Sequence, residues 1–329
     1  MDRADANTGT SISVPDDSVL PFSTVKSKAL GRLVRLGPLV DKVLSSHNYP
    51  ESVSEVLGQA IALTAMLGTT LKFEGNLILQ TKTDGPIGML VVNFETPGRI
   101  RAHASFDAAT LKSASSAAAI SRNDHGALLG EGYLALTIDP GKNMERYQGI
   151  VALDGQGLGD AALQYFRQSE QLPTFIKLAV ARLRTKADSK DEWRWRAGGL
   201  LIQHVTPSGG NSSKGGDITG NQDDDVLAGE ENDDWRRVEL LARTVEDHEI
   251  LDPSLAPERL LYRLFHEEGV RASNPRQLET FCRCSQERIQ NLFRSFKQEE
   301  INDLRNDQGD IIVTCEFCNF AYRYDENIS

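Results

Sequence analysis

The sequence lacks an uninterrupted apolar run long enough to span a bilayer. Its most apolar segment, residues 53–71, contains Glu55 and Gln59 as well as glycine and threonine, so it suits a packed helix better than a membrane span. The first ten residues also lack a basic stretch followed by an apolar one, which is the pattern of a secretory signal peptide. We therefore expect a cytoplasmic protein with no membrane partner.

The sequence has fewer lysine and arginine residues than acidic ones. The 329 residues contain 36 of them against 47 aspartates and glutamates, which gives a formal net charge of -11 at pH 7. This charge opposes binding to the phosphate backbone, so a nucleic-acid role would need a local basic surface. Residues 155–160 imitate a dinucleotide-binding loop, but Asp160 stands where the third glycine belongs. We interpret them as a turn followed by the start of a helix.

Cysteine is absent before residue 282. The four cysteines form two pairs, Cys282-Arg283-Cys284 and Cys315-Glu316-Phe317-Cys318. In a reducing compartment, clustered cysteines are more often metal ligands or redox groups than structural disulfides. Each pair can give two sulfurs to one ion, and the segment between them can bring the pairs together in the tetrahedral geometry that zinc accepts. We predict one Zn2+ ion held by Cys282, Cys284, Cys315 and Cys318.

The function of such a site remains open at this point. Spacing alone favours a purely structural zinc. A redox role rests on energy, because metal binding contributes about 10 to 16 kcal/mol to small modules, as much as the whole stability of a typical domain, so oxidised thiolates would release zinc and unfold the module. A zinc-ribbon nucleic-acid binder would use nearby basic residues such as Arg283 and Arg288. A disulfide oxidoreductase would use Cys315 and Cys318, but the βαβ context of that chemistry is missing.

The length and the changes in composition predict four regions. Residues 1–20 resemble a flexible polar tail, and residues 21–206 an α+β domain. Residues 207–271 form a flexible, acidic linker that becomes helical near Trp235, and residues 272–329 a small C-terminal zinc-binding domain. In the α+β domain we predict helices at 53–71, with one buried stripe, and at 159–168, starting at Asp160, and strands at 77–83, 87–94, 99–106, 132–138, 147–153, 175–180 and 200–205.

The C-terminal domain carries its own structural signals. Ser285 can cap a helix, and a hairpin is predicted from residues 311–314 and 320–324 around the second cysteine pair. The helix would turn four apolar residues to one side: Ile289, Leu292, Phe293 and Phe296. Histidines, by contrast, are scattered along the chain and none is near the cysteines in sequence, so isolated core or surface roles are expected for His47, His103 and His204.

Several short segments, in this order, occur together in one known family. They are His47-Asn48-Tyr49-Pro50, Leu71-Lys72-Phe73-Glu74-Gly75, Asp84-Gly85-Pro86, Glu145-Arg146-Tyr147-Gln148-Gly149, Ser169-Glu170-Gln171-Leu172-Pro173-Thr174, Ala197-Gly198-Gly199-Leu200-Leu201 and Arg263-Leu264-Phe265-His266-Glu267-Glu268. With the two cysteine pairs, the sequence resembles the 33 kDa chaperonin (heat shock protein 33) family of redox-regulated holding chaperones. The resemblance covers most of the chain and departs before residue 21 and around residues 208–234.

The resemblance implies a function that the residues alone leave open. It implies an ATP-independent molecular chaperone (holdase), not an enzyme, that binds unfolded or aggregation-prone client proteins under oxidative stress. The reduced, zinc-bound form would be inactive. Oxidation would join Cys282 to Cys284 and Cys315 to Cys318, release zinc and unfold the linker. A homodimer is expected on activation, and nucleic acid is not expected as a partner.

Overall fold

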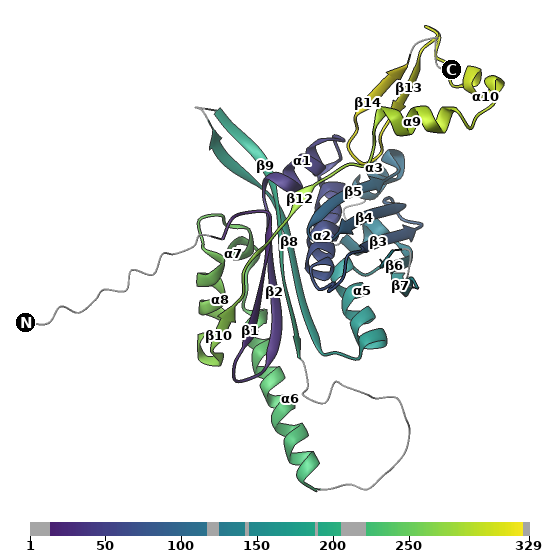
Figure 1. The fold of residues 1–329 in the computed structure, drawn as a ribbon. Coiled ribbons are helices and arrows are strands. Elements are labelled where there is room, and N and C mark those ends of the chain that lie inside the picture. The colour runs from purple at the N-terminus through teal and green to yellow at the C-terminus, as the bar shows by residue number, and fades with distance from the viewer. Residues whose placement is uncertain (1–13, 117–124, 142–144, 188–189, 205–221, 325–329) are drawn as a thin grey trace, which may run out of the picture.

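The structure is a computed structural model that describes residues 14–116, 125–141, 145–187, 190–204 and 222–324. Its body consists of two sheets of six strands each on either side of one long helix, and a smaller C-terminal module projects from it (Figure 1). Among these described residues, no helix is both long and apolar enough to cross a membrane. The α+β class predicted from the sequence is confirmed.

The first sheet contains the two longest strands. Its order is β10-β1-β2-β9-β8, and β11 also pairs with β1. All of its pairings are antiparallel. The strands are β1 (Ser18–Thr24), β2 (Ala29–Leu36), β8 (Thr174–Ala187), β9 (Lys190–His204), β10 (Val270–Ala272) and β11 (Arg276–Gln277).

The second sheet has the order β12-β5-β4-β3-β6-β7. Its pairings are antiparallel except for that between β12 and β5, which is parallel. The strands are β3 (Asn76–Thr83), β4 (Met89–Glu95), β5 (Arg99–Ser105), β6 (Glu131–Asp139), β7 (Tyr147–Asp154) and β12 (Glu279–Thr280).

Helix α2 (Glu51–Gly68) lies between the sheets and contacts strands of both. The prediction of one buried stripe on this helix was wrong, because a helix covered on two sides buries residues all around its axis. Small residues allow the close approach: a Cβ on Gly68 would lie 2.3 Å from the Phe94 ring. The other helices of the body are α1 (Pro38–Ser45), α3 (Ala108–Ser116), α4 (His125–Leu129) and α5 (Leu158–Tyr165).

The structure differs from the sequence expectations at several boundaries. Helix α5 begins at Leu158, two residues before the predicted start at Asp160, and its N-cap is Gly157 without a side-chain bond. Strands β1 and β2 are not predicted by the pattern because Pro21 and Gly31 weaken the strand signal. Strand β1 also begins inside the predicted tail, while residues 1–13 lie outside the described residues.

The linker region forms three helices on the outer face of the first sheet (Figure 1). They are α6 (Gln222–Arg243), α7 (Asp247–Leu251) and α8 (Pro257–Phe265). The acidic run 223–234, predicted as flexible, therefore lies in helix α6. The Gly- and Ser-rich stretch 208–216 lies outside the described residues.

The linker helices and the first sheet share a separate hydrophobic core. Phe265 of α8 is fully buried and stacks on Phe22 of β1, with 5.6 Å between the ring centroids. The sheet supplies Leu20, Phe22, Leu33, Phe175, Leu200 and Ile202, and the helices supply Val238, Ala242, Ile250, Leu260, Leu261, Leu264 and Phe265. Packing in this core holds the helices against the first sheet, although the sequence predicted this region to be a linker.

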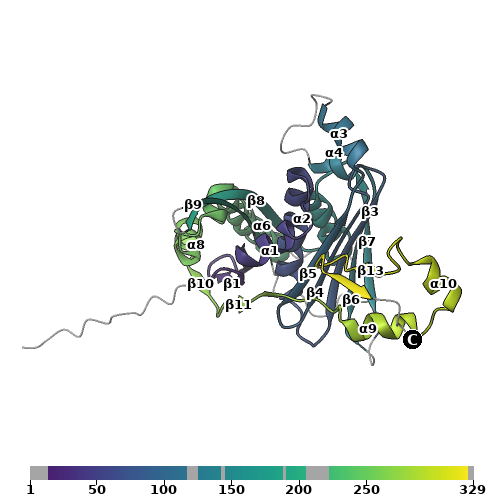
Figure 2. The same ribbon diagram turned by 90° about the horizontal axis from the view of Figure 1, so that it is seen from above.

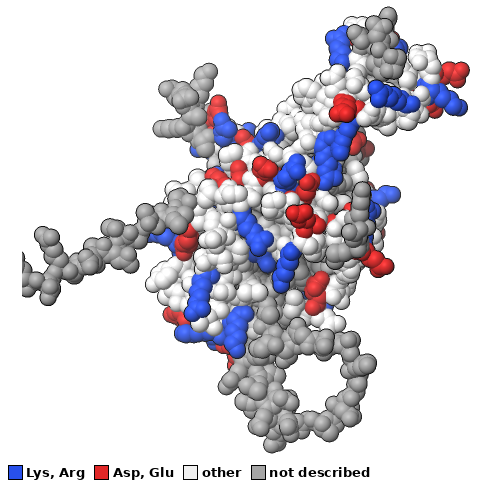
Figure 3. Space-filling model, in the orientation of Figure 1, with Lys and Arg blue, Asp and Glu red and all other residues white. Residues whose placement is uncertain are grey.

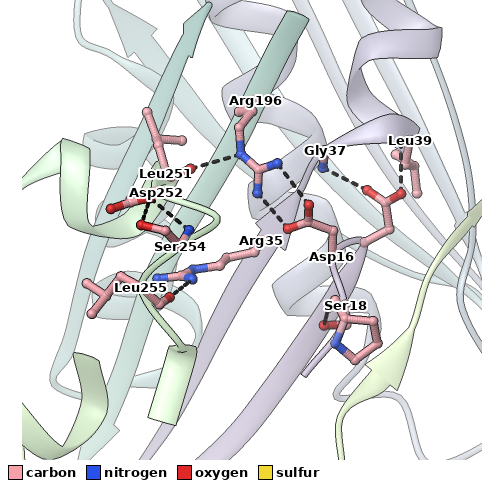
Figure 4. A network of polar contacts seen from close by, with 12 residues as sticks. Asp16, Ser18, Arg35, Gly37, Leu39, Arg196, Leu251, Asp252, Ser254 and Leu255 are labelled. Carbon is pink, nitrogen blue, oxygen red and sulfur yellow. Dashed lines mark hydrogen bonds and ion pairs between the residues drawn. The ribbon is translucent and has the colours of Figure 1, made fainter. Parts of the chain in front are cut away.

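Two arginines of the first sheet hold the linker by its backbone (Figure 4). Arg35 donates to the carbonyls of Glu249, at 2.8 Å, and Leu255. Arg196 donates through Nε to the carbonyl of Leu251 at 2.8 Å and pairs with both carboxylate oxygens of Asp16 at 2.5 and 2.9 Å. Burial and the charge of Arg196 lower the pKa of Arg35 to about 10, so Arg35 remains charged at neutral pH.

This contact predicts a measurable loss of stability. Arg196→Leu should lower the free energy of unfolding by about 2 kcal/mol, less than the 3 to 5 kcal/mol of a fully buried pair because Asp16 keeps some access to water. Urea denaturation measures the change. Arg194→Leu on the same strand is the control: Arg194 pairs with Asp41 and Glu192 at a half-exposed position, and the expected loss is below about 1 kcal/mol. Equal losses in the two variants would contradict the role of Arg196.

Candidate metal centre

The structure brings the four predicted cysteines into one cluster. Their Sγ atoms all lie within 4.8 Å of one another, and every side chain is partly buried. The distances are 3.2 Å from Cys282 to Cys284, 3.5 Å from Cys282 to Cys315 and 3.4 Å from Cys284 to Cys318. All four are free thiols. Residues separated by more than thirty positions therefore meet at one point.

Two local structures position the pairs. The first pair follows β12, and Ser285 caps helix α9 (Gln286–Phe293) by accepting from the backbone N–H of Arg288 at 3.2 Å, as predicted. The second pair occupies the turn between β13 (Ile311–Thr314) and β14 (Ala321–Tyr324). In that turn Asn319 has a φ of 56° and donates its N–H to the carbonyl of Cys315 at 2.8 Å. The predicted hairpin is confirmed.

The module around the cluster has a very small core. The buried residues are Phe293, Ile301, Ile311 and Tyr324, with Ile301 coming from helix α10 (Gln298–Asp303). The expectation that Leu292 and Phe296 share this side was wrong: Leu292 is 53% exposed and Phe296 39%. So few buried side chains contribute little hydrophobic stabilisation. We therefore expect the cysteine cluster to contribute much of the stability of this module.

The thiols differ in their electrostatic surroundings. Burial would raise the pKa of Cys284, but hydrogen bonds from Tyr322 and the neighbouring thiols outweigh burial and lower this pKa to about 7. Tyr322 donates its hydroxyl to Cys284 Sγ at 3.3 Å, and this bond raises the pKa of Tyr322 to about 12. Burial raises the pKa of Cys282 and of Cys318. Cys284 therefore loses its proton more readily than Cys282 or Cys318, and the thiolate is the form that binds metal.

The arrangement fits one tetrahedral ion. Metal–sulfur bonds of about 2.3 Å place the sulfurs of a tetrahedron about 3.8 Å apart. Three of the six separations between Sγ atoms are slightly shorter, at 3.2 to 3.5 Å, and all six are within 4.8 Å, so small side-chain shifts would bring the sulfurs to that distance. Four thiolates are also the donor set that zinc prefers in structural sites. These four residues could therefore hold a zinc ion without rearrangement of the chain.

Sequence reasoning missed the neighbours of the cluster in the body. His47, expected to have an isolated role, has its Nε2 atom 2.8 Å from the carbonyl of Glu316. The His103 ring lies 6.3 Å from that of Phe317. His204 stays remote from the cysteines and lies 6.0 Å from the ring of Trp235. More than two hundred residues separate His47 and His103 from the second cysteine pair, so no spacing rule could have found these contacts.

The family follows from comparison with known proteins. The family model described as Hsp33 protein matches residues 17–325. The chain belongs to the Hsp33 family. It is 40% identical over 312 residues to the 33 kDa chaperonin of Caulobacter vibrioides (strain NA1000 / CB15N), covering 95% of this chain and 96% of that protein. It is 37% identical over 313 residues to the 33 kDa chaperonin of Nitrosococcus oceani, covering 94% and 91%.

A solved structure shares the Hsp33 fold. The crystal structure of the 33 kDa chaperonin (heat shock protein 33 homolog) of Thermotoga maritima matches with a TM-score of 0.67 and 18% identity, covering 94% of this chain and 95% of that one. At this identity the likeness concerns the fold. The family and its curated names support a chaperone role, and they suggest a non-enzymatic one. The family resemblance predicted from the sequence is confirmed.

Proposed function

We propose that the protein is a redox-regulated, ATP-independent holding chaperone whose reduced, zinc-bound form is inactive. The observation that carries the proposal is the cluster of four free thiols at ligand distances, in a module whose described residues include only four buried core side chains. Zinc would be bound by Cys282, Cys284, Cys315 and Cys318, and its binding energy would keep this module folded. The ion would neutralise the charges of the thiolates and link the two cysteine pairs. Client proteins would bind to surfaces of the protein itself.

Oxidation would convert the metal ligands into disulfides. We propose the pairs Cys282 with Cys284 and Cys315 with Cys318, as the family resemblance implies. As each disulfide forms, a pair of thiolates transfers two electrons to the oxidant and no longer binds the metal, so zinc loses its ligands. The Sγ atoms of Cys282 and Cys284 are already 3.2 Å apart, which supports the first pairing.

The client surface in this proposal is the outer face of the first sheet. Helices α6 to α8 cover it, and their departure would expose Leu20, Phe22, Leu33, Phe175, Leu200 and Ile202. An apolar face of this kind binds exposed hydrophobic segments of unfolding proteins. Residues 21–206 would act as the chaperone core, 207–271 as the linker and 272–329 as the redox switch. We also propose a cytoplasmic location and a homodimer on activation, as the resemblance implies.

The nucleic-acid alternative receives less support. Basic residues near the cysteines make contacts within the chain: Arg283 pairs with Glu95 at 2.6 Å, and Arg288 donates to the carbonyl of Arg283 at 2.9 Å. On the described part of the face drawn in Figure 3, lysine and arginine side chains are interspersed with acidic ones. Phosphate backbones bind best to continuous basic surfaces.

Light scattering from a thermally unfolding client tests the proposal. The reduced, zinc-loaded protein should leave aggregation unchanged, while protein oxidised by peroxide at mild heat should suppress it. A thiol reductant with added zinc should reverse the effect, which controls for oxidative damage elsewhere. A reduced, zinc-loaded protein that suppresses aggregation as well as the oxidised one would sink the redox switch, and failure of both forms would sink the chaperone role.

A further inference from the structure

The turn that carries the second cysteine pair also contacts the two-sheet body. We call residues 315–319 the cysteine knuckle. Three of its residues reach the body: the carbonyl of Glu316 lies 2.8 Å from His47 Nε2, the Phe317 ring 4.1 Å from the guanidinium of Arg101, and Asn319 Nδ2 donates to the carbonyl of Ser46 at 2.7 Å. The metal ligands and the interdomain contacts therefore belong to one five-residue turn. Figure 2 shows the C-terminal module beside the second sheet, on the opposite side of the molecule from α8.

The body holds its side of this contact in place. His47 stacks on Tyr49, with 4.9 Å between centroids and 13° between planes, and its Nδ1 lies 2.8 Å from Ser46 Oγ. Because the carbonyl of Glu316 can only accept, the Nε2 atom of His47 carries the hydrogen of this contact. Tyr49 accepts in turn from the backbone N–H of Ala104 on β5 at 3.2 Å. The histidine is thus a positioned donor, which its isolated place in the sequence does not indicate.

The first cysteine pair is attached to the same region. Strand β12 pairs with β5, and the N–H of Phe281, one residue before Cys282, donates to the carbonyl of Ile100 at 3.1 Å. Arg101 lies between the two pairs, with its guanidinium 5.6 Å from the Phe281 ring as well as 4.1 Å from the Phe317 ring. Arginine stacked on aromatic faces gains cation–π attraction. One side chain of the body thus bridges both halves of the metal cluster.

Two of the four cysteines, Cys282 and Cys318, line this interface. A cavity of about 120 Å³ lies between the body and the module, and Arg101, Cys282, Phe317 and Cys318 are among its lining residues. Closing a disulfide within the knuckle would bring the Sγ atoms of Cys315 and Cys318 to about 2.05 Å from each other and change the backbone path of the turn between these residues. The contacts of Glu316, Phe317 and Asn319 depend on that path.

We propose that the body is part of the redox sensor: Arg101 and His47 act as positioning residues that hold both cysteine pairs at ligand distance and slow zinc loss during oxidation. The inference rests on the zinc site proposed above. In the oxidation step, two thiolates, one peroxide molecule and two protons give one disulfide and two water molecules, and zinc leaves as its ligands are lost. The disulfide in turn releases the knuckle from the body, so docking and metal binding stabilise each other.

The test measures zinc release from the full-length, zinc-loaded protein at a fixed peroxide concentration with a chromogenic chelator. Arg101→Leu should accelerate release about tenfold, since it removes the bridge between the two pairs. His47→Phe keeps a ring against Tyr49 but removes the donor, and about threefold acceleration is expected. Arg101→Lys should release zinc at a rate between those of the wild type and Arg101→Leu, because lysine keeps the charge but lacks the planar group. Arg146→Leu, at a 73% exposed position paired with Asp139, is the control and should release zinc at the wild-type rate.

Hydrogen exchange supplies a readout independent of zinc release. In the zinc-bound, reduced Arg101→Leu variant, amides of residues 279–281 and 315–319 should exchange faster than in the wild type, while amides of β3 and β4 should not change. Wild-type release rates and wild-type exchange in both the Arg101 and the His47 variants would overturn the docking role and leave the zinc proposal intact. A wild-type protein that binds no zinc would overturn both.

Discussion

Replacing Cys284 with serine is expected to abolish zinc binding and to unfold residues 282–324 while the two-sheet body remains folded. Zinc contributes about 10 to 16 kcal/mol to modules of this kind, and three remaining thiolates bind it far less well. Four buried side chains cannot replace that contribution, and helices as short as α9 and α10 are unstable alone in water. Zinc content by chelator titration and amide exchange in β13 and β14 measure the result.

A neighbouring substitution controls for this prediction. Ser285→Ala removes the N-cap bond to Arg288 and should cost about 1 kcal/mol, with zinc and the β13–β14 hairpin retained. The body has its own large core, so its thermal transition should be nearly the same in both variants. Continued protection of the hairpin amides in the Cys284→Ser protein would show that the module folds without the metal.

The cluster of four cysteines is the part of the site that the sequence could predict. Ligand spacing is local information: each pair lies within four residues, and zinc chemistry restricts how two such pairs combine. Capping by Ser285 and the hairpin around Cys315 follow from equally local rules. Most predicted strands are likewise present, because apolar alternation reports which face of a strand is buried.

The contacts between distant segments could not be predicted in this way. His47 and Arg101 become neighbours of the knuckle only through the positions of the α1–α2 connection and β5, which depend on the whole fold. Strand β8 extends to Ala187, well beyond the predicted end at residue 180, because it pairs with β9 along its full length. The helical state of residues 223–234 was also missed, since an acidic composition favours solvation without specifying a backbone conformation.

The linker helices connect the cysteine cluster to the proposed client surface. After α8 the chain forms β10 and β11, which both pair with β1. It then forms β12, which pairs with β5 and ends two residues before Cys282. This continuous path crosses the body from the first sheet to the second (Figure 1). Loss of β12 pairing after oxidation would therefore free one end of the segment that holds α8 in place. The stability of α8 on the first sheet then sets how easily the client surface opens.

Weakening that packing should activate the chaperone without oxidation. Phe265→Ala removes a fully buried ring stacked on Phe22, and such a change costs about 3 to 5 kcal/mol. We expect the reduced variant to suppress client aggregation, to keep its zinc, and to show rapid amide exchange in α7 and α8. Tyr262→Ala on the same helix, at a 64% exposed position, should change stability by less than about 0.5 kcal/mol and stay inactive when reduced. If amides of α7 and α8 exchange rapidly in reduced Phe265→Ala but the variant binds no client, the first sheet is not the client surface. In that case the helices would have uncovered the apolar face of the sheet without producing chaperone activity.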